Sequence, residues 1–268
     1  MPPSKQGGVM NRVGGWIGAV LLGLTLLVMP VAQAEPSAAD MARVIKQAEA
    51  GNREDQYFLG LSYDIGKGVP QDDKQAVIWY QRAADLGHAD AQYFLGRMYE
   101  DGRGITKNYK QAAFWYNKSA AQGELESLFS LGLMSVNGLG VSQDDKQAAS
   151  WFRKAAELGH VRSQYNLGVM YSEGRGMPQD YKQAVTWFRK AAERGDEMAQ
   201  HNLGAIYSRG EGVPQDFVKS YAWYSVAAAN GSKQSSEARD NAAQRLTPDQ
   251  LTKGQELAAS YFEKYQPK

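Results

Sequence analysis

The sequence predicts an all-α protein, a solenoid of five 36-residue helix-turn-helix repeats with helical caps. Three series of residues support this prediction, because each returns every 36 residues without an insertion. The first is the glycine of a Leu-Gly pair: Gly60, Gly96, Gly132, Gly168 and Gly204. The second is a tryptophan: Trp79, Trp115, Trp151, Trp187 and Trp223. The third is a glycine that closes each unit: Gly87, Gly123, Gly159, Gly195 and Gly231.

These series divide the chain into repeats and two ends. The five units are 52–87, 88–123, 124–159, 160–195 and 196–231. We expect an N-terminal capping helix within 35–51 and C-terminal capping helices within 232–268. The residues from Thr247 to Gln250 have the pattern of a capping box, with proline at the first helical position. Because one pair of helices cannot bury both of its apolar faces, each unit must stack on the next.

The first helix of each unit contains a glycine that needs an explanation. In the second unit, Leu95, Met98 and Tyr99 follow three- and four-residue steps, which predicts a helix over 89–101. Gly96 lies inside this helix, where glycine costs roughly 1 kcal/mol relative to alanine. We therefore expect the backbone of a neighbouring helix to approach this glycine closely.

The second helix of each unit begins at a residue that favours helix N-caps. These residues are Asp72, Asn108, Asp144, Asp180 and Asp216. Glutamine follows three residues later in the first four units, which completes a capping-box pattern. The tryptophans lie on the apolar side of these helices, and we expect them to form a continuous ladder inside the stack.

The N-terminus has the pattern of a secretory signal peptide over residues 1–34. A positively charged start precedes an uncharged run over 13–31, and Ala32-Gln33-Ala34 follows. We expect cleavage after Ala34, which would leave a periplasmic or secreted protein with no stable membrane insertion. The alternative is an uncleaved anchor, because the uncharged run approaches the length needed to span a bilayer.

Composition excludes several classes of function. The net charge of the 268 residues is +1 and no basic tract occurs, so we expect no nucleic-acid partner. Cysteine is absent, which excludes a thiol nucleophile, a disulfide framework and a thiolate metal site. His88 and His160 occupy the same helix-start position two repeats apart, so we expect neither a metal site nor a cofactor. No catalytic set of side chains stands out against the repeat pattern.

The units resemble the Sel-1-like repeat, a relative of the tetratricopeptide repeat. The matching motifs are A-x-x-x-L-G-x-x-Y, G-x-G-V, D-x-x-x-A and W-[YF]-x-x-A-A-x-x-G, and they cover residues 52–231. The resemblance implies a right-handed α/α superhelix whose concave face is lined mainly by first helices. It also implies an adaptor in signalling or assembly. Some exported relatives are rich in cysteine and are linked to β-lactams, and this chain departs from them in having no cysteine.

Positions that vary between units on the exposed face are the best candidates for partner binding. By resemblance to tetratricopeptide repeats, they lie just before the Leu-Gly pair, just after it and one turn further. The candidates are Tyr57, Phe58, Leu61, Tyr93, Phe94, Arg97, Phe129, Ser130, Leu133, Tyr165, Asn166, Val169, His201 and Asn202. They change from aromatic and apolar to amide-bearing along the chain, which suits a peptide or helix laid in a groove. The alternative is that Tyr57, Tyr93, Phe129 and Tyr165 belong to the core.

The third unit breaks the pattern, because Ser135 stands where the other units have tyrosine. Loss of the ring could open a pocket or could be absorbed by local repacking. The leading hypothesis for the whole chain is a non-enzymatic scaffold or adaptor of the bacterial envelope that binds a protein or peptide partner. The alternative is an enzyme that acts on cell-wall material or β-lactams.

Overall fold

The computed structural model describes residues 36–265, and this part of the chain contains thirteen helices and no strand. The helices are α1 (Ala38–Glu49), α2 (Arg53–Ile65), α3 (Asp73–Asp85), α4 (Ala89–Asp101), α5 (Tyr109–Ala120), α6 (Leu125–Asn137), α7 (Asp145–Glu157), α8 (Val161–Glu173), α9 (Tyr181–Ala192), α10 (Glu197–Arg209), α11 (Phe217–Ala229), α12 (Lys233–Ala243) and α13 (Pro248–Tyr265).

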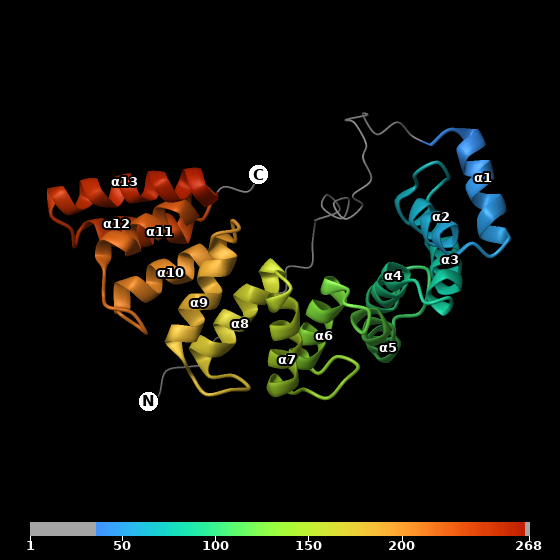
Figure 1. Ribbon diagram of the computed structural model, residues 1–268, viewed down its shortest axis with the longest axis horizontal. Helices are drawn as coiled ribbons and strands as arrows, with labels where there is room; N and C mark the ends of the chain where they lie inside the picture. Colours follow the sequence, from blue (N-terminus) through green and yellow to red (C-terminus); the bar gives the residue numbers. More distant parts are fainter. Residues whose placement is uncertain (1–35, 266–268) are drawn as a thin grey trace. The chain divides into compact units, whose positions relative to one another are not determined.

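The helices pack in chain order as an α/α solenoid (Figure 1). Helices α2, α4, α6, α8 and α10 are the first helices of the five units, and α3, α5, α7, α9 and α11 are the second helices. Each second helix packs against its own first helix. The first four also pack against the first helix that follows, and α11 packs against α12 and α13 instead. The predicted fold class is therefore confirmed for the described residues.

The predicted N-caps are confirmed, but the capping box of the second helices is wrong. Asp72 accepts hydrogen bonds from the backbone amides of Lys74 and Gln75, and its counterparts cap their helices in the same way. The backbone amide of Asp72 donates to the carbonyl of Tyr63 at 2.9 Å. The donor that a capping-box glutamine would bind is therefore already satisfied by the first helix.

The glycine of each Leu-Gly pair is required by a different contact from the one predicted. A Cβ added to Gly96 would lie 2.7 Å from ring atoms of Tyr116, which follows the tryptophan on the second helix. A ring therefore approaches the glycine, and the expected close approach of a helix backbone is wrong. The same contact recurs at the other four Leu-Gly glycines, against Tyr80, Phe152, Phe188 and Tyr224. The four rings that follow the first four tryptophans are at most 1% exposed.

The tryptophans do not form the predicted ladder, because each lies in a different hydrophobic cluster. Trp115 of α5 packs with Tyr80 and Leu95, between the preceding second helix and its own first helix. A cation three residues later covers the ring in four units, as Lys118 does over Trp115 at 4.7 Å. In the fifth unit, Tyr261 and Tyr265 of α13 lie 4.4 and 5.9 Å from the Trp223 ring instead.

Buried glutamines connect successive units. The side-chain amide of Gln92 on α4 donates to the carbonyl of Ala84 on α3 at 3.0 Å. Gln56, Gln164 and Gln200 make the same bond across their own unit boundaries. Leu128 replaces this glutamine in the third unit and is buried in the hydrophobic cluster around Tyr116.

The ends of the array use the same contacts. Gln56 donates to Ala48 of α1, so α1 stands where a second helix would stand. Thr247 and Gln250 form the predicted capping box at the start of α13, with bonds of 3.0 and 3.3 Å. Helix α13 packs along α11, where a Cβ on Gly254 would lie 2.9 Å from the Tyr221 ring.

The predicted signal segment 1–34 and its cleavage after Ala34 lie outside the described residues. Within 36–265, no helix is long and apolar enough to cross a membrane.

Replacing Gly96 with alanine should lower the free energy of unfolding by about 1–3 kcal/mol, because the new methyl group would overlap the Tyr116 ring. Helix propensity alone would predict a gain of about 1 kcal/mol, so the sign separates the two effects. The measurement is chemical denaturation of Gly96→Ala, Tyr116→Leu and the double variant. Strictly additive losses would contradict the contact, since the smaller side chain should accommodate the methyl group.

The tryptophans should differ in their contributions according to burial. Trp115 is 5% exposed, so Trp115→Ala should cost about 3–5 kcal/mol. Trp151 is half-buried, and Trp151→Ala should cost less. Denaturation midpoints of the two variants, measured side by side, check this order. Equal losses of stability in the two variants would show that the buried area of the ring does not determine how much each tryptophan stabilises the fold.

Candidate functional site

The fourteen predicted binding residues lie on the first helices α2, α4, α6, α8 and α10, and we call them the first-helix face. All except Phe129 are at least partly exposed. Phe58 is the most clearly exposed ring, at 39%, and Arg97 is also exposed. Two of the fourteen residues are therefore exposed, eleven are half-buried and one is buried, so this face is only partly open to solvent.

The residue two positions before each Leu-Gly pair packs against the aromatic residue that follows the tryptophan. The ring centroids are 6.2 Å apart for Tyr57 and Tyr80, and 5.9 Å apart for Tyr93 and Tyr116. The other three units repeat the pair, with separations of 5.8, 5.9 and 5.2 Å. These rings therefore contact the core on one side and, Phe129 apart, keep part of their surface open.

Burial of these rings has an electrostatic consequence. Burial raises the pKa of Tyr93 to about 12, and it raises the pKa values of Tyr57 and Tyr165 as well. Nearby carboxylates, such as Asp90 and Glu124 for Tyr57, act in the same direction. The hydroxyl groups of this row are therefore neutral donors at physiological pH.

A charged cluster joins the third and fourth units. Glu126 lies 3.1 Å from Nε2 of His160, and it also pairs with Arg162. The Arg162 guanidinium stands 4.2 Å above the Phe129 ring. Burial works against ionisation of Glu126, but the bond to His160 and the charge of Arg162 lower its pKa. The cluster explains why Phe129 is the one covered residue of the face.

A hollow of about 360 Å³ opens between α8 and α10. Its floor is formed by Phe188 and Ile206, which are at most 2% exposed, together with Val169. The rim is polar and consists of Tyr165, Ser172, Glu173, Tyr181, Asn202 and Arg209. Three residues of the first-helix face, Tyr165, Val169 and Asn202, therefore share one concave site.

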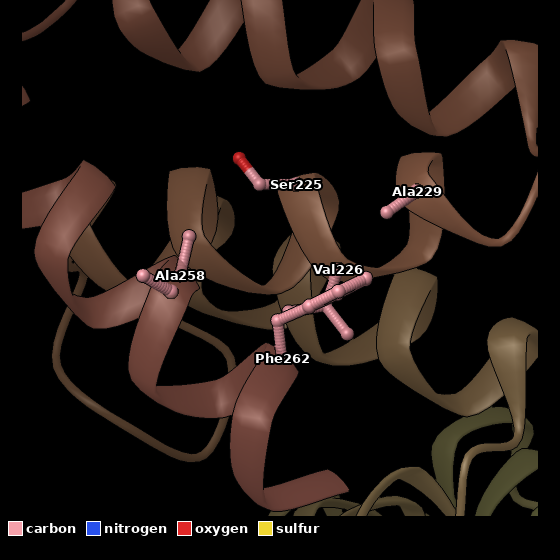
Figure 2. Close-up of a pocket in the computed structure, with 6 residues that line it drawn as sticks. Ser225, Val226, Ala229, Ala258 and Phe262 are labelled. Carbon is pink, nitrogen blue, oxygen red and sulfur yellow. The ribbon is translucent and has the colours of Figure 1, made fainter. Parts of the chain in front are cut away.

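A second hollow, of about 300 Å³, lies between α11 and α13 (Figure 2). Its lining is almost wholly apolar and consists of Ser225, Val226, Ala229, Ala258, Ala259 and Phe262. None of these residues belongs to the predicted face.

The histidines occupy structural positions. His88 and His160 are the N-caps of α4 and α8 and accept from backbone amides, as the helix-start prediction requires. Nε2 of His88 lies 2.9 Å from Glu54 of the preceding unit. His201 is part of the aromatic row and bonds to Ser235 of α12. No group of three or more potential metal ligands occurs within residues 36–265.

Comparison with known proteins identifies the repeats. Five consecutive segments match the Sel1 repeat: 54–88, 89–124, 125–160, 161–196 and 197–232. The chain belongs to the Sel1 repeat family. A Sel1 repeat protein from Oxalobacter formigenes is 36% identical over 74% of this chain, with a TM-score of 0.67. The protein c5321, described as a protective antigen present in uropathogenic Escherichia coli strains with an SLR fold, is 32% identical over 87% of this chain, with a TM-score of 0.58.

The chain spans 58% of the length of each of those two structures. No curated protein sequence matches it. Sel1 repeat proteins are generally scaffolds for protein–protein interaction and are typically non-catalytic. Membership of this family therefore agrees with the prediction of a protein-interaction scaffold, but it does not identify a partner.

The irregular third Sel1 unit is locally repacked around Ser135. This residue is 1% exposed, and its hydroxyl donates to Gln147 at 3.3 Å. Leu133 and Val136 of the same helix pack in the cluster that contains Phe152. The hollow on the first-helix face lies instead between the fourth and fifth Sel1 units.

The sequence pattern predicted three of the nine residues that line this hollow, Tyr165, Val169 and Asn202. It missed Phe188 and Ile206 of the floor, because both belong to the regular apolar pattern of their helices. It also missed Glu173 and Arg209, which occupy the last turn of α8 and α10 at the same place in successive units. The residue at this last-turn position differs between the five units, and that variation could have identified Glu173 and Arg209 from the sequence.

The Glu126 cluster predicts a pH-dependent contribution to stability. Its pKa is lowered from 4.5 on folding, so the stabilisation is complete above that value and is lost as pH falls through the lower, folded-state pKa. At pH 7, Glu126→Gln should cost about 1 kcal/mol, at the upper end for surface pairs because Glu126 is only 34% exposed. The deficit should shrink below pH 4.5.

The control is Asp90→Asn in the second unit, where the residue 34 positions later is the acid Glu124 rather than a histidine. Denaturation midpoints measured from pH 3 to pH 7 provide the comparison. A Glu126→Gln deficit that stays constant over this range would contradict the proposed role of the carboxylate charge.

Proposed function

We propose that this protein is a non-enzymatic scaffold of the bacterial envelope that binds a protein or peptide partner on its first-helix face. The observation that carries the proposal is that the same buried contacts repeat in every unit while the exposed residues of the first helices differ. We call the repeated buried contacts the frame. The frame supplies the buried glycine–ring contacts, while Phe58, Arg97 and Asn202 present a ring, a cation and an amide at equivalent or neighbouring places. Such a surface gives a long polypeptide several chemically distinct contacts.

The envelope location rests on the sequence of residues 1–34. A charged start, an uncharged run and Ala32-Gln33-Ala34 are typical of an exported protein. The absence of cysteine is compatible with either side of the membrane, so it adds nothing to this part of the proposal. Cell fractionation together with N-terminal sequencing of the protein would test export and cleavage after Ala34.

The binding face is tested by a crosslinked pull-down from an extract of the source cells. The variant Phe58→Ser with Arg97→Ala changes two exposed residues of the face, and we expect it to lose a partner that the parent captures. The loss should be at least about tenfold, because rings and arginines carry much of the energy at interfaces.

The matched control is Ile78→Ser with Lys118→Ala, which makes the same kinds of change on exposed residues of second helices. We expect this variant to capture the partner as the parent does. Circular dichroism and thermal unfolding establish that both variants fold. Equal capture by the parent and both variants would overturn the assignment of the site to the first-helix face.

A further inference from the structure

Four of the second helices present the same exposed pattern, in which two cations flank a residue that varies. On α5 the pattern is Lys110, Phe114 and Lys118, which lie four residues apart and therefore on the same side of the helix. The first cations of the four helices are Lys74, Lys110, Lys146 and Lys182, and the second cations are Arg82, Lys118, Lys154 and Lys190. All eight are exposed, and together with the four residues between them we call them the cationic face.

The second cations have a role in the fold. Each lies in the last turn of its helix, where the helix dipole favours positive charge. Each also stands over the tryptophan ring of its own helix, as Lys190 does over Trp187 at 4.1 Å. Packing and helix electrostatics therefore account for these four residues.

The first cations have no such role. Each is the second residue of its helix, where the positive end of the dipole disfavours a cation. Within residues 36–265, the lysine that forms an ion pair with an acid is Lys219, which does not belong to this row. A lysine that opposes the helix dipole in four successive units leaves its charge available to a partner outside the chain.

The fifth unit shows what happens where the chain covers this side of a second helix itself. Helix α11 has Val218 and Val226 in the places of the two cations, and Ala222 between them. Helices α12 and α13 pack against α11, and Val226 is only 3% exposed. The cations therefore occur on the four helices whose equivalent side is open to solvent.

Charge is separated between the two sets of helices, although the net charge of the whole chain is only +1. Helices α5 and α9 contain five basic residues and no acidic one, whereas α2 and α4 contain six acidic residues and two basic ones. On α3 and α7, Asp73 and Asp145 pair with Arg103 and Arg175 of the following units. The second helices therefore attract anions, and the first two first helices repel them.

We propose that the cationic face docks the protein on the surface of an anionic phospholipid bilayer, which leaves the first-helix face free for its polypeptide partner. Seven of the eight cations are lysines. Lysine is depleted in protein–protein interfaces, whereas anionic headgroups attract it as a point charge without demanding an exact geometry. The composition of the face therefore favours a lipid surface over an acidic protein.

The residues between the cations add apolar contact on two of the four helices. Ile78 of α3 and Phe114 of α5 are 43% and 48% exposed, and each lies between two cations of its own helix. Exposed apolar side chains flanked by lysine suit the boundary between headgroups and acyl chains. Ser150 and Thr186 are polar at the same places, so we expect the first two units to penetrate furthest.

The test is cosedimentation with vesicles of phosphatidylcholine that contain a quarter of phosphatidylglycerol, compared with vesicles of phosphatidylcholine alone. The chain used begins at Glu35, because Pro36–Lys268 is a compact unit by itself and the uncharged run over 13–31 would bind bilayers directly. We expect saturable binding to the anionic vesicles only, which weakens as salt rises from about 0.05 M to about 0.5 M. Equal binding to both kinds of vesicle, or binding to neither, would overturn the proposal.

The deciding variant replaces the four first cations together, as Lys74→Gln, Lys110→Gln, Lys146→Gln and Lys182→Gln. We expect its affinity for the anionic vesicles to fall at least about tenfold. The matched control changes four exposed lysines elsewhere, as Lys46→Gln, Lys107→Gln, Lys233→Gln and Lys253→Gln, and should bind as the parent does. Circular dichroism establishes that both variants fold. Equal affinities of the two variants would show that only net charge matters and would contradict a defined face.

A second variant, Ile78→Ser with Phe114→Ser, separates a bilayer from an acidic polypeptide. It should weaken vesicle binding at least about threefold and leave binding of poly-L-glutamate unchanged, because the apolar side chains act only where acyl chains are present. Binding of poly-L-glutamate without binding of vesicles would overturn the proposal in favour of an acidic protein. Phe58→Ser with Arg97→Ala should bind vesicles as the parent does, so failure here would leave the first-helix proposal standing.

Discussion

The contact between the Leu-Gly glycine and the ring that follows the tryptophan determines how each pair of helices packs. A side chain at Gly96 would collide with Tyr116, so the two helices can lie this close only with glycine there. The close approach leaves the ring buried and makes a flat apolar floor beneath each first helix. Every other feature of the unit, from the tryptophan cluster to the exposed face, is positioned relative to that floor.

The same floor has different coverings along the array. Phe94 covers it at the first boundary, and Arg162 covers the neighbouring Phe129 at the third. At the fourth boundary Asn202 stands in the place of Phe94, and the floor ring Phe188 is still only 1% exposed. A frame that is constant in its buried contacts can therefore present distinct surfaces, because the residues that cover the floor carry little of the packing within the unit.

Periodicity made the architecture predictable, because helix starts, buried faces and glycine positions recur five times in one chain. Pairwise contacts were harder to infer. The glycine at Gly96 implied a close approach, but only the structure shows that a ring of the same unit makes it. The capping-box glutamines failed for a comparable reason, since the carbonyl of Tyr63 had already satisfied the Asp72 amide. Both errors came from partners distant in sequence and near in space.

The site was partly visible in the sequence for the same physical reason. Tyr165, Val169 and Asn202 could be found by comparing equivalent positions, because exposed positions tolerate change whereas floor positions do not. Phe188 could not be distinguished from the other four floor rings, because all five recur at the same spacing and are at most 7% exposed. Which side chains line a hollow depends on contacts between neighbouring units, and the spacing of residues within one unit does not report those contacts.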